Sequence, residues 1–155
     1  MQVSPNGINM IKSDEGLRLT AYQDQAEVWT IGYGSVSYQN GAAVKKGDVI
    51  TMQQAEDLLL WEVNMKTGSV ASMVSGVALN QNQYDSLIDF AYNAGTGALQ
   101  VSTLLKRIKA NPQDPTITDA FMMWDKIHVD GQLVYNAGLA ARRQREAQLY
   151  FTPMS

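Results

Sequence analysis

The strongest constraint on the fold is a change in hydrophobic period at Gly16. Residues 4–15 open with a Ser-Pro pair, which is typical of a helix start, and carry two isoleucines three residues apart. Residues 17–22 alternate between apolar and polar side chains, which indicates a β-strand. Because a glycine commonly ends a helix in the left-handed conformation, the sequence predicts that a helix passes into a strand within one turn.

A β-rich segment continues to about residue 50. Residues 28–31 form a second β-type run, so residues 23–27 are expected to make the connecting turn. Residues 36–38 suggest a third short strand. The Asn-Gly pair at residues 40–41 is a strong turn signal, and residues 45–48 have the composition of a loop.

The rest of the chain has mainly helical patterns. Thr51 and Gln54 form a capping box in front of a helix predicted over Met52 to about Lys66. An Asp-Gly turn between alternating residues predicts a β-hairpin over residues 126–135. The other predicted helices are a short one over residues 70–74, one capped by Asn80 and ended at residues 93–97, one opened by Ser102 and ended by Asn111-Pro112, one capped by Thr116 or Thr118, and a last one over residues 139–150.

Composition narrows the class of protein. The 155 residues suit a single globular domain, with 45% hydrophobic and 17% charged residues. The absence of cysteine excludes disulfides, zinc–thiolate sites and cysteine nucleophiles. A single histidine, His128, leaves little from which to build a histidine-based triad or a multi-histidine metal site.

Charge and hydropathy bear on the partners. The net charge of −3 argues against nucleic acid or an anionic membrane as the main partner, because both attract basic surfaces. The N-terminus lacks the basic and apolar regions of a signal peptide, and no stretch reaches the length of a membrane span. We therefore expect no signal peptide, no signal anchor and no membrane insertion.

Two carboxylates and a hydroxyl in the first thirty residues could support hydrolysis. Glu15 lies at the predicted helix end, Asp24 where the first strand turns, and Thr30 near the end of the second strand. A glycosidase needs one acid to protonate the leaving oxygen and a second carboxylate to activate water or attack the sugar. An apolar cleft would raise the pKa of Glu15 and keep it protonated, while Asp24 stays ionised and Thr30 holds a water. Residue types and spacing alone favour two solvated surface acids over such a site.

The same segment resembles the phage-type lysozyme (endolysin, muramidase) family. In that family a Glu, eight residues, an Asp, five residues and a Thr form the catalytic triplet, and Glu15, Asp24 and Thr30 reproduce this spacing. Further stretches resemble the family in chain order: Leu79–Gly97, Ser102–Leu105, Trp124 and Gly138–Glu146.

The resemblance implies a fold and its lobes. The fold is α+β and lysozyme-like, with a small N-terminal β-containing lobe, a larger all-helical C-terminal lobe and a cleft between them. We expect one domain over residues 1–155. Its approximate parts are a β lobe over 14–50, a connecting helix over 51–67, and a helical lobe made of 1–13 and 68–155.

The resemblance also implies a reaction. The expected substrate is bacterial peptidoglycan, cleaved with inversion at the β-1,4 bond from N-acetylmuramic acid to N-acetylglucosamine. Glu15 would be the general acid, while Asp24 and Thr30 would position the attacking water. An inverting site needs its carboxyl groups roughly 6.5–9.5 Å apart. The residues expected to contact substrate are Tyr33, Gly34, Ser35, Asn93 and Gly95; no metal and no cofactor are expected.

The family context implies a biological setting. The chain would be a phage lysis enzyme made in the host cytoplasm and released by a holin to act on the cell wall in the periplasm. We expect a monomer. Arg142 and Arg143 could touch the acidic substrate, but pairing of an arginine with Glu146 or with the helix that carries Glu15 is more ordinary. The family pattern fits a scaffold role for at least one of them, and we expect one guanidinium to reach the Glu15 helix end.

Two residues depart from the family pattern. Glu27 stands where glycine is common in the turn after Asp24, and Ser35 stands where histidine is common. Glu27 would either distort the turn and raise the pKa of a neighbouring acid, or simply point to solvent. With the low pI of about 5.0, these departures motivate an alternative: a catalytically impaired peptidoglycan-binding protein on the same fold.

Overall fold

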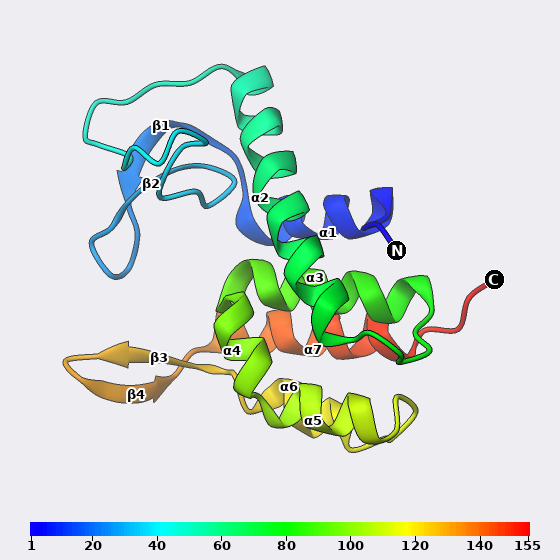
Figure 1. The fold of residues 1–155 in the computed structure, drawn as a ribbon. Helices are drawn as coiled ribbons and strands as arrows, with labels where there is room; N and C mark the ends of the chain where they lie inside the picture. Colours follow the sequence, from blue (N-terminus) through cyan, green and yellow to red (C-terminus); the bar gives the residue numbers. More distant parts are fainter. The chain divides into compact units, whose positions relative to one another are not determined.

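The computed structural model describes residues 1–155, which form seven helices and four strands (Figure 1). The elements are α1 (Pro5–Glu15), β1 (Arg18–Gln23), β2 (Trp29–Gly32), α2 (Met52–Met73), α3 (Gln81–Ala94), α4 (Thr96–Val101), α5 (Thr103–Ala110), α6 (Ile117–Met122), β3 (Lys126–Val129), β4 (Gln132–Tyr135) and α7 (Ala137–Phe151). The predicted α+β class is confirmed. The chain divides into two compact units: a β-containing unit over Ile8–Met65, and a helical unit made of Met1–Gly7 and Lys66–Ser155.

The helix-to-strand transition at Gly16 is confirmed. Gly16 has φ +69°, and its amide donates to the Lys12 carbonyl at 3.0 Å, which ends α1. Strand β1 then pairs antiparallel with β2, and Tyr22 lies opposite Thr30. The pairing is irregular between Arg18 and Tyr22, so β1 holds more residues than the facing part of β2.

The core of the β-containing unit is small. Its buried centre is Ile31, Val44 and Leu58, which joins the sheet, the following loop and α2. Four partly buried side chains pack against it: Ala21, Trp29, Tyr38 and Ile50.

The predicted third strand over residues 36–38 is wrong. Only one isolated bridge forms there, between Ser37 and Ala43. The tight turn at Asn40-Gly41 explains this result: the Gly41 amide donates to the Tyr38 carbonyl at 2.9 Å, so the segment reverses before a ladder develops. The turn itself is confirmed, with φ +85° at Gly41.

Helix α2 begins at the predicted capping box and runs further than expected. The Gln54 amide donates to Thr51 Oγ1 at 3.1 Å, and Gln54 Oε1 accepts from the Thr51 amide at 2.8 Å. The helix continues to Met73 and absorbs the short separate helix predicted over residues 70–74. Gly68 alone does not break it, since a lone glycine costs only about 1 kcal/mol in a helix interior. None of the helices, α2 included, combines the length and apolarity needed to cross a membrane.

Helix α3 is the buried centre of the helical unit, and it packs along α7 (Figure 1). Its predicted capping box is confirmed, with the Gln83 amide donating to Asn80 Oδ1 at 2.9 Å. Phe90 makes edge contacts with Phe121 and Trp124, with ring centroids 6.1 and 5.7 Å apart. The apolar residues on more than one face of α3 are therefore core residues.

Arg142 and Arg143 of α7 are buried scaffold residues. Arg142 donates through Nε and Nη2 to the Asp89 carboxylate, both at 3.0 Å, and Arg143 Nε lies 3.2 Å from Glu146. Burial, followed by the neighbouring Asp89, raises the pKa of Glu146 well above its usual range. The predicted pairing of an arginine with Glu146 is confirmed.

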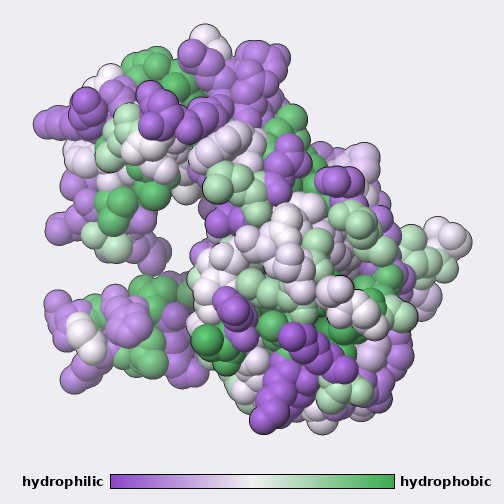
Figure 2. All heavy atoms as spheres, in the orientation of Figure 1, coloured by the Kyte–Doolittle hydropathy of each residue, from purple (hydrophilic) through white to green (hydrophobic).

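The helical unit contains one helix that was not predicted and one hairpin that was. Helix α4 was not predicted, because Thr96 and Gly97 were assigned to the cap of the preceding helix. The hairpin β3–β4 was predicted, and its turn has φ +49° at Asp130 and +78° at Gly131, as a type I′ turn requires. This hairpin makes the larger unit less than purely helical. Figure 2 shows hydrophobic and hydrophilic residues side by side on the hairpin, where Leu133 is 62% exposed.

Candidate functional site

Glu15 is the last residue of α1, and its carboxylate lies directly against Gly34. A β-carbon on Gly34 would stand 2.5 Å from Glu15 Oε2 and 3.2 Å from Cδ. Gly34 also has φ +86°, which side chains rarely adopt. Two independent reasons therefore require glycine here, and one of them is the close approach of the backbone to the Glu15 carboxylate.

A tight loop between Ile31 and Ser35 holds Gly34 in place. The Ile31 amide donates to the Ser35 carbonyl at 2.8 Å, and the Ser35 amide donates back at 2.9 Å. Ser35 is 2% exposed, and its Oγ has no hydrogen-bond partner within the protein. A buried unpaired hydroxyl is uncommon, so Ser35 keeps unused hydrogen-bonding capacity one residue from Gly34.

Asp24 is fixed by the turn that follows β1. Its Oδ1 accepts hydrogen bonds from the amides of Ala26 at 2.8 Å and Val28 at 2.9 Å. The Asp24 amide donates to the Val28 carbonyl at 3.0 Å, which closes the turn. The residue is exposed to solvent. The turn thus orients one carboxylate oxygen through two backbone donors and leaves the group open to water.

Thr30 is buried, with 3% of its surface exposed. Its hydroxyl donates to the Val28 carbonyl at 2.9 Å. A hydroxyl has a single donor hydrogen, so Thr30 Oγ1 can bind a water only by accepting a hydrogen bond from it. That water would keep its own lone pairs for attack.

Tyr22 was not among the predicted site residues, and it lies close to both acids. The pKa of its hydroxyl is raised, mainly by partial burial. The negative charge of Glu15 and, more weakly, that of Asp24 add to this shift. The Arg18 guanidinium lies 4.8 Å from the ring centroid and opposes this shift. Its place opposite Thr30 and two residues before Asp24 was a signal in the sequence.

Glu27 has a left-handed backbone conformation, which glycine adopts most readily. Its φ is +61°, its amide donates to the Asp24 carbonyl at 3.0 Å, and its side chain is exposed. The prediction that Glu27 points to solvent is confirmed. The turn therefore closes with a glutamate in the left-handed conformation.

Tyr33 is 8% exposed, and its hydroxyl donates to Glu56 Oε1 on α2 at 3.2 Å. This burial leaves little of the ring for stacking on a sugar. A direct contact between Tyr33 and substrate stays a prediction, and the observed contacts favour a supporting role behind Gly34.

Asn93 and Gly95 belong to the helical unit. Asn93 is exposed, and its Oδ1 accepts a hydrogen bond from Arg143 Nη2. Gly95 joins α3 to α4 with φ +96°, and its amide donates to the Ala91 carbonyl at 3.0 Å. Contact of these two residues with substrate stays a prediction.

Comparison with known proteins identifies the chain's relatives. The family model described as phage lysozyme matches residues 12–146. The chain is 39% identical over 150 residues to an endolysin of Acyrthosiphon pisum secondary endosymbiont phage 1, covering 97% of this chain and 98% of the relative. It is 36% identical over 152 residues to the endolysin of Salmonella phage P22, covering 98% and 99%. Among solved structures, the endolysin from Escherichia coli O157:H7 phage FAHEc1 superposes with a TM-score of 0.91 at 40% identity, covering 97% of this chain and 94% of that one.

Proposed function

The chain belongs to the phage lysozyme family, and we propose that Glu15 is its general acid in an inverting cleavage of the muramic acid–glucosamine bond. The chain is a lysozyme-type endolysin, a glycoside hydrolase that acts on peptidoglycan. Its predicted lysozyme-like fold is confirmed. The proposal concerns the residues that carry the reaction and its stereochemistry.

The contact between the Glu15 carboxylate and Gly34 carries this proposal. Backbone packed against one side of a carboxyl group leaves little room for water on that side and limits the positions that the group can take. A general acid must be held within hydrogen-bond reach of the leaving oxygen. The positive φ of Gly34 allows the loop to approach Glu15 without a side chain in the way.

Asp24 and Thr30 form the second half of the proposed mechanism. Asp24 is held by two backbone amides and is open to solvent, so we assign its carboxylate to accept a proton from water. Thr30 Oγ1 accepts the water's other hydrogen, because its own hydrogen is donated to Val28. The water's lone pair then attacks the anomeric carbon while Glu15 protonates the departing glycosidic oxygen. Inversion requires a separation of roughly 6.5–9.5 Å between the two carboxyl groups.

The proposed substrate contacts fall into two groups. Gly34 lies beside Glu15, and Ser35 follows it with a buried hydroxyl, so contact of this pair with the glycan is proposed through the loop backbone. Asn93 and Gly95 would contribute from the helical unit. Tyr33 would act mainly by holding the loop, with at most an edge contact to the glycan.

The endolysin acts on the host cell wall. We propose that the protein is made in the host cytoplasm as a monomer and reaches the wall after a holin opens the membrane. Export measured in cells with and without a holin separates this route from self-directed export.

The alternative remains a peptidoglycan-binding protein with impaired catalysis. Glu27, Ser35 and the low pI motivated it, and the exposed side chain of Glu27 weakens the first of these three. The two readings make different predictions for single variants.

Clearing of a murein suspension tests the proposal. Glu15→Gln and Asp24→Asn should each lose at least 100-fold in rate, and Thr30→Ala should lose less. Glu27→Gln removes an acid from the same turn and serves as the matched control, with near-wild-type activity expected. The proposal fails if Glu15→Gln clears murein as fast as wild type, and the binding-protein alternative is correct if the wild type binds murein without releasing reducing ends.

A further inference from the structure

A three-residue network in the β-containing unit joins α1, the Gly34 loop and α2. Lys12 Nζ on α1 lies 2.7 Å from each oxygen of Glu56 on α2. The Tyr33 hydroxyl donates to Glu56 Oε1 at 3.2 Å, and Lys12 Nζ lies 5.6 Å from the centre of the Tyr33 ring. Glu56 is thus the common partner of the other two side chains.

Both arms of this network lead to Glu15. Lys12 stands three residues before Glu15 on α1, a spacing that puts two side chains on one helix face roughly 5–6 Å apart. Tyr33 immediately precedes Gly34, whose backbone contacts the Glu15 carboxylate. Glu56 therefore anchors the loop that touches Glu15 and also holds the cation nearest to Glu15 along its own helix.

Charge gives Glu56 a second effect on Glu15. Hydrogen bonding from Lys12 lowers the pKa of Glu56, so Glu56 is ionised at neutral pH and offsets the charge of Lys12. Other charged or titratable groups near Glu15 in this unit are Asp14 on α1, Arg18 and Tyr22 on β1, and Asp24 after β1. Glu56 is bonded both to Lys12 on α1 and to Tyr33, the residue before Gly34.

We propose that Glu56 is a positioning residue for Glu15. It holds the Gly34 loop through Tyr33, and its negative charge offsets that of Lys12, which would otherwise favour loss of the Glu15 proton. This inference rests on the proposed role of Glu15 as general acid. It assigns function to a residue that lies 41 positions away in sequence and outside the catalytic triplet.

The test is the pH dependence of kcat/KM on soluble murein fragments, whose alkaline limb reports loss of the catalytic proton. Glu56→Gln leaves Lys12 uncompensated, so the limb should move to lower pH by about half a unit. Lys12→Met leaves Glu56 uncompensated, so the limb should move to higher pH by a similar amount. The double variant should return the limb to within about 0.2 units of wild type.

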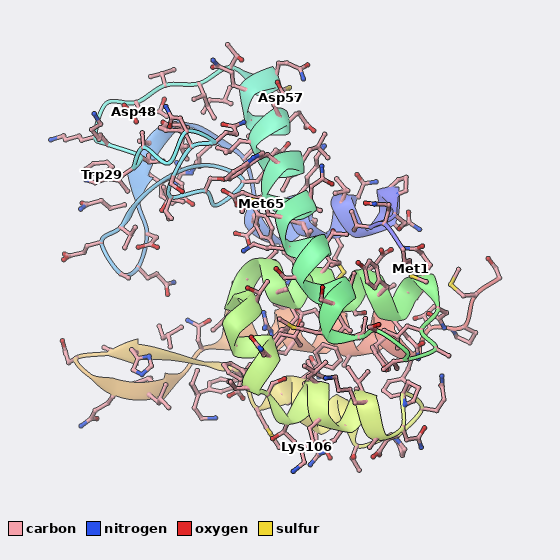
Figure 3. All side chains as sticks on the ribbon, in the orientation of Figure 1. Met1, Trp29, Asp48, Asp57, Met65 and Lys106 are labelled. Carbon is pink, nitrogen blue, oxygen red and sulfur yellow. The ribbon has the colours of Figure 1, made fainter.

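A purely structural role would not give opposite shifts that cancel. Asp57→Asn is the matched control, because it neutralises the next acid along α2 (Figure 3). The Asp57 carboxylate accepts a hydrogen bond from Gln53 on its own helix. Its limb should stay in place. Tyr33→Phe breaks the other arm without a charge change, so kcat should fall several-fold while the limb keeps its position.

The inference is overturned if Glu56→Gln and Lys12→Met shift the alkaline limb in the same direction. It is also overturned if both variants keep the limb at the same pH as the Asp57→Asn control. Circular dichroism and thermal unfolding establish that each variant is folded. Failure of the proposed function is a different result, namely an active Glu15→Gln. An inactive Glu15→Gln with unshifted Glu56 and Lys12 variants would reject the inference alone.

Discussion

Replacing Gly34 by alanine perturbs the contact on which the proposed site depends. The added β-carbon would stand 2.5 Å from Glu15 Oε2, whereas ordinary contact begins at 3.4 Å. The carboxylate or the loop must therefore move by about 0.9 Å, the difference between these distances. Since the Glu15 side chain is the softer partner, we expect its carboxylate to move.

The expected effect of Gly34→Ala on stability can be separated from its effect on the catalytic rate. A left-handed alanine costs about 1–2 kcal/mol, and the stiffer unfolded chain offsets roughly 0.4–1 kcal/mol of it. The free energy of unfolding should thus fall by about 1 kcal/mol. A 1 Å displacement of a catalytic group costs about 100-fold in rate, so Gly34→Ala should lose far more activity than stability.

Gly41→Ala is the matched control. Gly41 has φ +85°, against +86° for Gly34, and a β-carbon there would meet nothing within 4 Å. Both variants should lose similar stability in urea unfolding, and only Gly34→Ala should clear murein slowly. Equal activities of the two variants would refute the reasoning, because the contact with Glu15 would then have no catalytic consequence.

Three further predictions concern stability. Glu27→Gly should raise the unfolding free energy by up to about 1 kcal/mol by relieving φ +61°, with unchanged clearing of murein; a lower melting temperature would contradict this. Gly7→Ala should lower the unfolding free energy by about 1–3 kcal/mol in urea, because its β-carbon would lie 2.7 Å from Val3 Cγ2 and 2.8 Å from Asp85 Cγ. Unchanged stability would show that these side chains can move aside without cost. The Lys45 amide and then the Tyr38 hydroxyl lower the pKa of Asp48, so its ionised form contributes stability above an unfolded-state pKa of about 3.9 that is lost as pH falls. Asp48→Asn should therefore lose less stability than wild type between about pH 5 and pH 3, and equal losses would reject the assignment.

Local features of the fold were predictable from sequence. The capping boxes at Thr51 and Asn80, the glycine stop at Gly16 and the Asp-Gly hairpin turn all depend on hydrogen bonds between residues a few positions apart. Such bonds form wherever the residue types and spacing occur, so the pattern contains the information. The wrong prediction of a strand over residues 36–38 also has a local cause, because the turn at Gly41 reverses the chain before a strand can form.

Long-range partners were not predictable. Asp85 on α3 accepts the Ser4 amide at 3.0 Å across 81 positions, and Glu56 accepts Lys12 across 44. Spacing along the chain carries no information about such pairs, because tertiary packing alone brings them together. The proposed catalytic triplet came from family resemblance, whereas the Gly34 contact, the position of Tyr22 and the proposed role of Glu56 required the structure.

The central claim is that a water held by Asp24 and Thr30 attacks while Glu15 protonates the leaving oxygen. Proton NMR of freshly cleaved murein glycan tests it directly, by following the anomeric signal of the new muramic acid end before mutarotation. The account predicts the α-anomer first, as inversion of a β-linkage requires. A β-anomer first, or a 1,6-anhydro end without a free anomeric hydroxyl, would contradict it.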